Sequence, residues 1–432
     1  MVQDNNRRMK DSGIPWIGMI PSDWSFDMIG NLYTLRNEKV SDKDYPPLSV
    51  GKMGVVPQLG TAAKTDDGDN RKLVRKGDFA INSRSDRRGS CGISEYDGSV
   101  SLINTIITPK CEMNPRYYNW FFHTEAFADE FYRWGHGIVD DLWTTRWQEM
   151  KRISVVFPPL STQQRIADFL DRKCAEIDEL AALQETMIEE LKRYKQSLIT
   201  ETVTKGLDPN APMKDSGVEW IGEIPEGWVV LPFKQMYQLG KGLSITKADL
   251  VENGVPVISY GQIHSKSNTG TTIKDELIRY VPSSFLENSK DALVKIGDVI
   301  FADTSEDLEG CGNCIYVDRG MTLFAGYHTI IASNRNSSST RYLPYLFKTD
   351  CWRTQIRAVV NGVKLFSVPQ KTLAATSIIL PPLYEQQQIA DYLDRKCAEI
   401  DELIAIKQQK VEALKEYKKS VIFEYVTGKK EL

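Results

Sequence analysis

Two nearly identical stretches decide the fold of this chain. The stretch Ile166-Ala-Asp-Phe-Leu-Asp-Arg-Lys-Cys-Ala-Glu-Ile-Asp-Glu-Leu180 returns as Ile389-Ala-Asp-Tyr-Leu-Asp-Arg-Lys-Cys-Ala-Glu-Ile-Asp-Glu-Leu403, with 14 of 15 positions identical. An earlier phrase, Met9 to Trp24, returns at Met213 to Trp228 with 11 of 16 positions identical. The segments between these copies hardly resemble each other. Such a pattern indicates one repeated frame that holds two different inserts.

Length and composition indicate a multidomain globular protein. A chain of 432 residues is long for a single core, and its 41% hydrophobic and 26% charged residues are ordinary values. We find no run of about 18 apolar residues and no apolar signal core at the start, so we expect a cytosolic protein. The formal net charge of −4 argues against a protein that coats nucleic acid through bulk charge.

The repeat divides the chain into four segments. We expect a first globular domain at 1–159, a first long helix at 160–206, a second globular domain at 207–382 and a second long helix at 383–432. Each insert contains short β-branched and aromatic runs broken by Gly, Asn, Asp and Pro, which predicts strands with a few helices. The expected fold class is therefore α+β.

Apolar residues recur in heptads after each Pro-Pro pair, which predicts two coiled-coil helices of roughly 60 Å. We interpret Lys173 and Lys396 as polar seam residues that either fix the register or contact a partner. Gly206 and Gly428 should end the helices. The apolar seam residues are predicted to be Ile166, Leu170, Ile177, Leu180, Leu191, Leu198, Ile389, Leu393, Ile400, Leu403, Leu414 and Val421.

Chain connectivity favours antiparallel pairing of the two helices. A lone amphipathic helix of this length would leave its seam in water, so the copies should pair with each other. Antiparallel pairing lets the second domain lie between the end of one helix and the start of the next. It also brings the C-terminal segment beside the first copy of the repeated phrase. We therefore expect two inverted domains with near-cyclic, pseudo-twofold symmetry.

Catalytic and metal-binding signatures are missing from the sequence. No Gly-Lys-Ser/Thr ends a glycine loop, and no Asn/Asp-Pro-Pro-Tyr/Phe motif is present. The four histidines are not spaced as metal ligands or catalytic bases. Cys311 and Cys314 form a single CxxC, which suits a buried turn better than a zinc site. We expect no catalytic residues and no metal.

Polar and basic loops in both inserts are candidates for DNA contact. Lys64 to Arg88 contains eight basic and five acidic residues, and arginine can bind guanine edges or phosphates. A solvated charged loop would explain the same pattern. The candidate residues are Lys64, Arg71, Arg84, Arg87, Arg88, His136, Thr145 and Arg146 in the first insert, and Lys241, Gln262, His264, Lys266, Asn268, Asn361 and Lys364 in the second.

The order of these motifs resembles the specificity subunit of type I restriction-modification systems. The likeness covers the whole chain: a Lys-Asp-Ser-Gly-x-x-Trp-Ile-Gly-x-Ile-Pro-x-x-Trp phrase, a variable region, and Pro-Pro-Leu-x-x-Gln-Gln-x-Ile-Ala-x-Phe/Tyr-Leu-Asp-x-Lys, then the same order again. One departure is Tyr384, which lacks the Ser or Thr found at the start of the first helix.

The resemblance implies two target-recognition domains that each read one half of a bipartite DNA sequence, with the helices as spacer and docking platform. It implies double-stranded DNA, two methyltransferase subunits and restriction subunits as partners. No cofactor is expected on this chain, whereas S-adenosylmethionine, ATP and Mg²⁺ are expected in the partner subunits. The alternative is a coiled-coil scaffold whose domains bind proteins, which mobility shifts with random and specific duplexes would distinguish.

Overall fold

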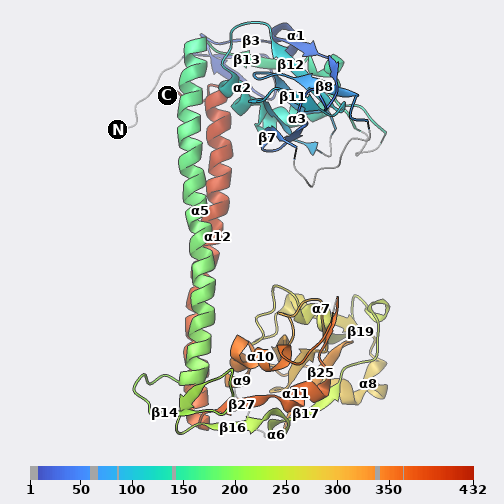
Figure 1. Cartoon of the computed structure of the whole chain (residues 1–432), viewed down its shortest axis with the longest axis vertical. Coiled ribbons are helices and arrows are strands. Elements are labelled where there is room, and N and C mark those ends of the chain that lie inside the picture. Colours follow the sequence, from blue (N-terminus) through green and yellow to red (C-terminus); the bar gives the residue numbers. More distant parts are fainter. Residues whose placement is uncertain (1–7, 59–66, 85–86, 139–142, 336–340, 363) are drawn as a thin grey trace. The chain divides into compact units, whose positions relative to one another are not determined.

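The computed structural model describes residues 8–58, 67–84, 87–138, 143–335, 341–362 and 364–432. They form two compact units. Unit 1 is Met1–Thr186 with Lys407–Leu432, and unit 2 is Met187–Ile406. Each unit contains one globular domain and part of each long helix (Figure 1). Among the described residues, we find no helix whose length and hydropathy would let it span a bilayer.

The domain of unit 1 is built on a four-stranded antiparallel sheet with the order β10-β9-β12-β4. Smaller sheets pair β11-β8-β5, β6-β7, β13-β3 and β1-β2. The elements are β1 (Met9–Asp11), β2 (Met19–Pro21), β3 (Ser25–Met28), α1 (Ile29–Leu32), β4 (Tyr33–Arg36), β5 (Lys39–Val40), β6 (Leu48–Gly51), β7 (Gly54–Pro57), β8 (Arg71–Val74), β9 (Phe79–Asn82), β10 (Cys91–Ile93), β11 (Gly98–Val100), β12 (Asn104–Pro109), α2 (Pro115–Phe122), α3 (Glu125–Arg133), α4 (Trp147–Met150) and β13 (Ser154–Phe157).

The domain of unit 2 repeats the central sheet, with the order β17-β25-β21-β23 and antiparallel pairs throughout. It differs in a second four-stranded sheet, β19-β18-β24-β20, in which β18 and β24 are parallel. The two inserts therefore diverge mainly beside a shared sheet.

The elements of this second domain are β14 (Met213–Asp215), β15 (Glu223–Pro225), β16 (Val229–Pro232), α6 (Phe233–Met236), β17 (Tyr237–Lys241), η3 (Lys247–Asp249), β18 (Val255–Ile258), α7 (Tyr260–Ile263), η4 (Asp275–Leu277), β19 (Arg279–Val281), α8 (Phe285–Asn288), η5 (Lys290–Ala292), β20 (Leu293–Val294), β21 (Val299–Ala302), β22 (Thr304–Ser305), β23 (Cys314–Tyr316), β24 (Leu323–Ala325), β25 (Thr329–Asn334), α9 (Tyr342–Phe347), α10 (Asp350–Arg357), β26 (Phe366–Ser367), α11 (Gln370–Ala375) and β27 (Ser377–Leu380).

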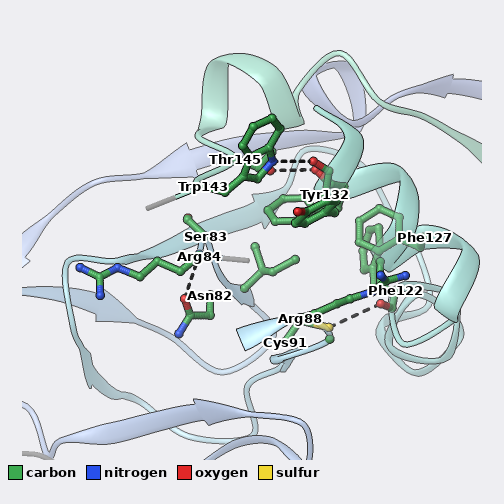
Figure 2. Close-up of a pocket in the computed structure, with 14 residues that line it drawn as sticks. Asn82, Ser83, Arg84, Arg88, Cys91, Phe122, Phe127, Tyr132, Trp143 and Thr145 are labelled. Atoms are coloured by element: carbon green, nitrogen blue, oxygen red, sulfur yellow. Dashed lines mark hydrogen bonds between the residues drawn. The ribbon is translucent and has the colours of Figure 1, made fainter. Parts of the chain in front are cut away.

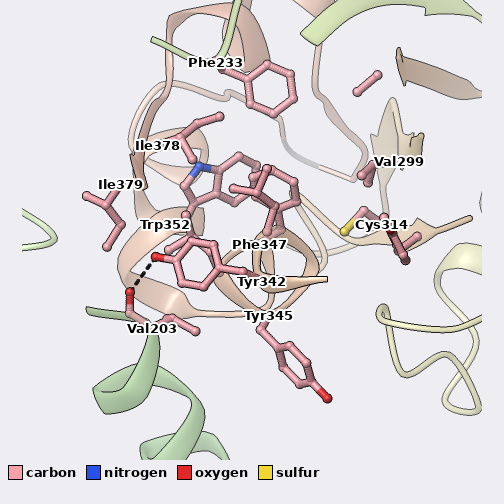
Figure 3. Close-up of a cluster of buried hydrophobic side chains, with 14 of the residues drawn as sticks. Val203, Phe233, Val299, Cys314, Tyr342, Tyr345, Phe347, Trp352, Ile378 and Ile379 are labelled. Carbon is pink, nitrogen blue, oxygen red and sulfur yellow. Dashed lines mark hydrogen bonds between the residues drawn. The ribbon is translucent and has the colours of Figure 1, made fainter. Parts of the chain in front are cut away.

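Aromatic side chains fill the space between each central sheet and the helices that follow it. In unit 1, Phe79 of the sheet lies 4.3 Å from Phe122 of α2, measured between ring centroids. In unit 2, the ring of Phe301 lies 5.5 Å from that of Phe347 and 5.8 Å from that of Trp352. Figure 3 shows Phe347 and Trp352 within this buried cluster. Burial of such large side chains is the main source of stability for each domain.

The long helices are α5 (Leu160–Lys205) and α12 (Leu383–Val426), and they run antiparallel within each unit. In unit 1, Lys418 Nζ lies 2.6 Å from Asp178 Oδ2. In unit 2, Lys195 Nζ lies 2.6 Å from Asp401 Oδ2. Lys195 and Asp178 each have their counterpart 223 positions later. The α+β fold with antiparallel helices is thus confirmed, and equivalent helix contacts recur in the two units.

One of the two predicted seam positions was wrong by one residue. Leu180 and Leu403 are 49% and 48% exposed, and Lys173 pairs with Glu176 at the surface. The seam instead alternates through these buried or partly buried residues of α5: Gln163, Ala167, Leu170, Cys174, Ile177, Ala181, Gln184, Ile188, Leu191, Lys195 and Leu198.

Burial elsewhere explains the seam error. Ile166 and Ile389 are buried within the domain cores, so counting heptads from them displaces the seam by one position. The other predicted seam residues are buried or partly buried: Leu170, Ile177, Leu191, Leu198, Leu393, Ile400, Leu414 and Val421.

The repeated phrase packs against the end of a long helix in each unit. In unit 1, Gly428 follows α12 at φ +73°, and a Cβ there would lie 2.4 Å from Pro21. The Tyr117 hydroxyl donates to the Val426 carbonyl at 2.7 Å. In unit 2, Tyr342 donates to the Val203 carbonyl at 2.8 Å (Figure 3). The C-terminal segment thus lies beside the first copy of the phrase, as near-cyclic symmetry requires.

Each domain is also fastened to its helix by the same kind of polar contact. In unit 1, Arg116 pairs with Asp168 and Asp171, and the Trp120 indole donates to Asp171 at 2.7 Å. In unit 2, Asp394, the counterpart of Asp171, accepts from Arg341 and from the Tyr345 hydroxyl. The repeated helix sequence therefore provides a repeated attachment point for unlike domains.

Candidate nucleic-acid interface

Two predicted loops of the first domain are joined into one surface. Backbone bridges pair Thr144 with both Arg84 and His136, and the Thr145 amide donates to the Ser83 carbonyl at 2.9 Å. The segment after β9 and the segment between α3 and α4 thus lie side by side. Neighbouring sequence could not have shown this, because the two segments are about 60 residues apart.

The exposed candidates of the first domain are basic. Arg84, Arg87, Arg88, His136 and Arg146 are all exposed. Arg88 forms an ion pair with Asp129, and both side chains are largely exposed to solvent. Exposed guanidinium groups of this kind can bind phosphate oxygens or guanine edges.

An aromatic pocket lies beneath this surface (Figure 2). The Tyr132 and Trp143 rings stack at 5.8 Å, and the Trp143 indole donates to the Tyr132 carbonyl at 3.0 Å. The cavity has a volume of about 20 Å³, which is room for roughly one water molecule. Its shape suits a rigid support for the segment that contains Arg84 and Arg146, rather than a cofactor site.

Two candidates of the first domain are internal, which corrects their predicted role. Thr145 is 2% exposed, and its hydroxyl donates to the Phe131 carbonyl. Arg71 is also 2% exposed, and its guanidinium donates to the side chain and carbonyl of Ser99. Burial of a guanidinium among hydrogen-bond acceptors holds strands together but keeps it from DNA. Lys64 lies outside the described residues.

Two candidates of the second domain are likewise occupied by internal hydrogen bonds. The His264 ring contacts the Thr304 carbonyl at 2.8 Å and the Asn313 amide at 3.1 Å. The Asn268 side chain donates to the carbonyls of Ile263 and Cys314. Both ring nitrogens and the whole amide group are therefore used within the domain, and neither residue is a good base reader.

The remaining candidates of the second domain are accessible but scattered. Gln262 is partly buried, and its Oε1 accepts from the Ser259 amide at the start of α7. The other four are exposed: Lys241, Lys266, Asn361 and Lys364. Lys241 lines a cleft of about 670 Å³ together with Asp303, His328 and Lys371.

His328 and its neighbours were missed by the sequence analysis. Among described residues, His328 is the only non-glycine residue with positive φ, at 53°. Its Nδ1 lies 3.3 Å from Asp303 Oδ1, and its ring centroid lies 5.4 Å from that of Tyr260. A left-handed backbone conformation at histidine has no sequence signature. Only the dipeptide Tyr327-His328 before a strand hinted at a turn.

Two of the buried cysteines, Cys91 and Cys314, are structural in character. Burial raises the pKa of the Cys91 thiol to about 12 and that of Cys314 to about 11. A thiol with a raised pKa is a poor nucleophile and a poor metal ligand at neutral pH. Within the described ranges, no group of three or more His, Cys, Asp or Glu side chains is placed to hold a metal ion.

Two solved structures share the fold of this chain. A chain from a study of complex assembly and conformational transition of the type I R-M system matches with a TM-score of 0.71 and 15% identity, covering 94% of this chain and 98% of that one. The HsdS subunit from Thermoanaerobacter tengcongensis matches with a TM-score of 0.55 and 16% identity, over 95% and 98%.

Sequence comparison finds similarity to specificity subunits of type I restriction enzymes. Residues 225–416 match the type I restriction modification DNA specificity domain. The type I restriction enzyme MjaVIII specificity subunit of Methanocaldococcus jannaschii is 25% identical over 282 residues, which cover 65% of this chain and 62% of that protein. The EcoKI specificity subunit of Escherichia coli strain K12 is 22% identical over 212 residues, covering 48% and 44%.

The matched region thus spans less than two thirds of each of these relatives. The domain match, the doubled motif order and the fold agree with one another. In sequence over these regions and in fold, the chain is therefore similar to type I restriction-modification specificity subunits.

Proposed function

We propose that this chain is the non-catalytic, DNA-reading subunit of a type I restriction-modification complex, with one half of a bipartite target read by each domain. The main support is the combination of one shared backbone frame with unlike exposed side chains at the same edge of each domain. A repeated frame suits repeated tasks, whereas unlike side chains suit two unlike base sequences.

The basic side chains fit the first task, which is holding a DNA duplex. Arg84, Arg87 and Arg146 are exposed on the joined loops of the first domain. Lys241 and Lys371 line the large cleft of the second. The chain as a whole has a net charge of −4. These local basic surfaces would therefore attract phosphates although the whole chain would not.

Exposed apolar residues on the long helices fit the second task, which is holding partner subunits. In unit 1, Leu180 and Leu183 are 49% and 51% exposed, and Tyr417 beside the Lys418–Asp178 pair is 48% exposed. Unit 2 has the counterparts Leu403, Ile406 and Tyr194 with similar exposure. Large apolar side chains gathered on a surface mark protein-binding sites.

The duplication also suggests the number of partners. Two equivalent helix surfaces should bind two copies of one protein, and in this family the fitting partner is the methyltransferase subunit. Restriction subunits would then join the methyltransferase assembly. S-adenosylmethionine, ATP and Mg²⁺ belong to the chemistry of those partners in this proposal, and the present chain supplies no catalytic group.

The proposal is tested by expressing the chain with its methyltransferase and mapping methylated adenines in host DNA by single-molecule sequencing. The expected result is one bipartite motif with a constant gap between its halves. The methyltransferase expressed alone is the control. Absence of any motif that depends on this chain would contradict the proposal.

A further inference from the structure

The turns that precede β12 and β25 hold equivalent places in the two domains. In unit 1, the Ser83 amide donates to the Ile103 carbonyl at 3.2 Å. In unit 2, the Asp303 amide donates to the His328 carbonyl at 3.1 Å. Both turns therefore lie against the end of the preceding central strand, β9 or β21.

A third segment joins this arrangement in each domain. The Ser83 carbonyl accepts from the Thr145 amide at 2.9 Å, and the Asp303 carbonyl accepts from the Val368 amide at 2.7 Å. The same three backbone segments thus meet in both domains.

The turns are also closed by equivalent side-chain hydrogen bonds. Asn104 Nδ2 donates to the Ser101 carbonyl at 3.0 Å, and Thr329 Oγ1 donates to the Gly326 carbonyl at 2.7 Å. The residues that shape each turn are therefore its first and last. Its two central residues are not needed for closure.

These central residues differ completely between the domains. Leu102 and Ile103 are 39% and 37% exposed in unit 1. Tyr327 is partly buried and His328 is exposed in unit 2. An apolar pair on one edge and an aromatic, hydrogen-bonding pair on the other present different chemistry from turns at equivalent places.

The conformation of His328 indicates that its side chain is retained for a purpose other than folding. A φ of 53° is unfavourable for a residue with a Cβ, and glycine or asparagine would adopt it more readily. Residues kept in such conformations cluster at functional sites. With Nδ1 beside Asp303, Nε2 is the ring nitrogen left to meet a base edge.

The charges around the turn suit a DNA duplex on one side. The cleft that His328 and Tyr327 share also contains Lys241 and Lys371. A second cleft, lined by Tyr260, contains the acidic residues Glu306, Asp307 and Glu309. The DNA phosphates would therefore lie toward the lysines. In that position the turn would face a groove of the duplex.

We propose that the central residues of these turns determine base specificity in both domains. Tyr327 and His328 form polar contacts with base edges in the half-site read by unit 2. Leu102 and Ile103 form apolar contacts, for which the thymine methyl group is the matching partner, in the half-site read by unit 1. This inference rests on the proposed DNA-reading function.

The test uses the full-length chain co-purified with its methyltransferase and a random-sequence duplex library. His328→Gly and His328→Asn both suit the backbone at this position, so their melting temperature should equal or exceed that of the wild type. Each should bind the selected sequence about 5- to 150-fold more weakly and relax the preference at one or two adjacent positions of one half-site.

Ile103→Ala is the matched variant in unit 1, and it should relax positions in the other half-site alone. Unchanged base preferences in folded His328 variants would overturn the inference while leaving the DNA-reading function intact. A wild-type complex that enriches no bipartite sequence would instead contradict the proposed function itself.

Discussion

Single residues show how a repeated sequence acquires unlike environments. Asp78 and Asp298 follow the repeated glycines Gly77 and Gly297, and each accepts a hydrogen bond from the amide three residues before it. In unit 1, Asp78 also pairs with Arg36. In unit 2, burial raises the pKa of Asp298. The same Gly-Asp pair thus forms the same turn in both units, but the other partners of each carboxylate come from strands far along the chain.

Lys348 gives a prediction at this scale, because burial, aided by Lys195, lowers the pKa of its ammonium group to about 8. In the unfolded chain the pKa is about 10.4. Between these values the unfolded state binds more protons, so the contribution of Lys348 to stability rises with pH. At pH 7 the folded state holds a penalised charge. Lys348→Met should therefore stabilise unit 2 by about 1–3 kcal/mol at pH 7.

Urea unfolding at pH 7 and pH 10 checks this prediction. The advantage of Lys348→Met should shrink at the higher pH, because the wild-type lysine is then neutral in the folded state. Lys266→Met, at an exposed position, is the control and should stay near wild-type stability at both values. An advantage that is equal at pH 7 and pH 10 would show that burial does not penalise the Lys348 charge.

At the scale of elements, the long helices were the most predictable part of the molecule. Heptad spacing and the Pro-Pro pairs predicted their extent, since both signals are local. The seam was wrong at one position because Ile166 and Ile389 are buried by the domains rather than by the partner helix. That error hid two exposed apolar surfaces, one around Leu180 in unit 1 and one around Leu403 in unit 2.

If each of the two exposed apolar surfaces on the long helices binds one methyltransferase, removing one surface should remove one partner. Leu180→Glu with Leu183→Glu should abolish one docking surface, because a buried carboxylate without a partner opposes association. Loss of a central apolar contact weakens binding by about 30-fold or more. Native mass spectrometry should then show one methyltransferase per chain in place of two.

The equivalent change in unit 2, Leu403→Glu with Ile406→Glu, is the matched variant and should also leave one partner bound. The quadruple variant, which combines all four substitutions, should bind no methyltransferase. Two partners on either double variant would mean that docking uses another surface.

For the whole molecule, the sequence predicted the organisation better than the site. The repeat, its offsets and the antiparallel helices followed from patterns that need no knowledge of the domains. The reading surface did not, because hydrogen bonds within the domains decide that His264 and Asn268 are internal while His328 is exposed. Loop residues distant in sequence meet only after the strands are paired.

In our proposal, one pair of long helices holds two unlike DNA-reading domains and sets the gap between the half-sites. Inserting one heptad after Glu185 in α5 and after Gln408 in α12 keeps the seam in phase and adds about 10 Å to the pair. With duplex DNA rising about 3.4 Å per base pair, the gap should change by about one to three base pairs.

Mapping methylated adenines in cells that carry this variant with its methyltransferase measures the gap directly. We expect the same two half-sites separated by a changed gap. The same half-sites at the original gap would contradict it.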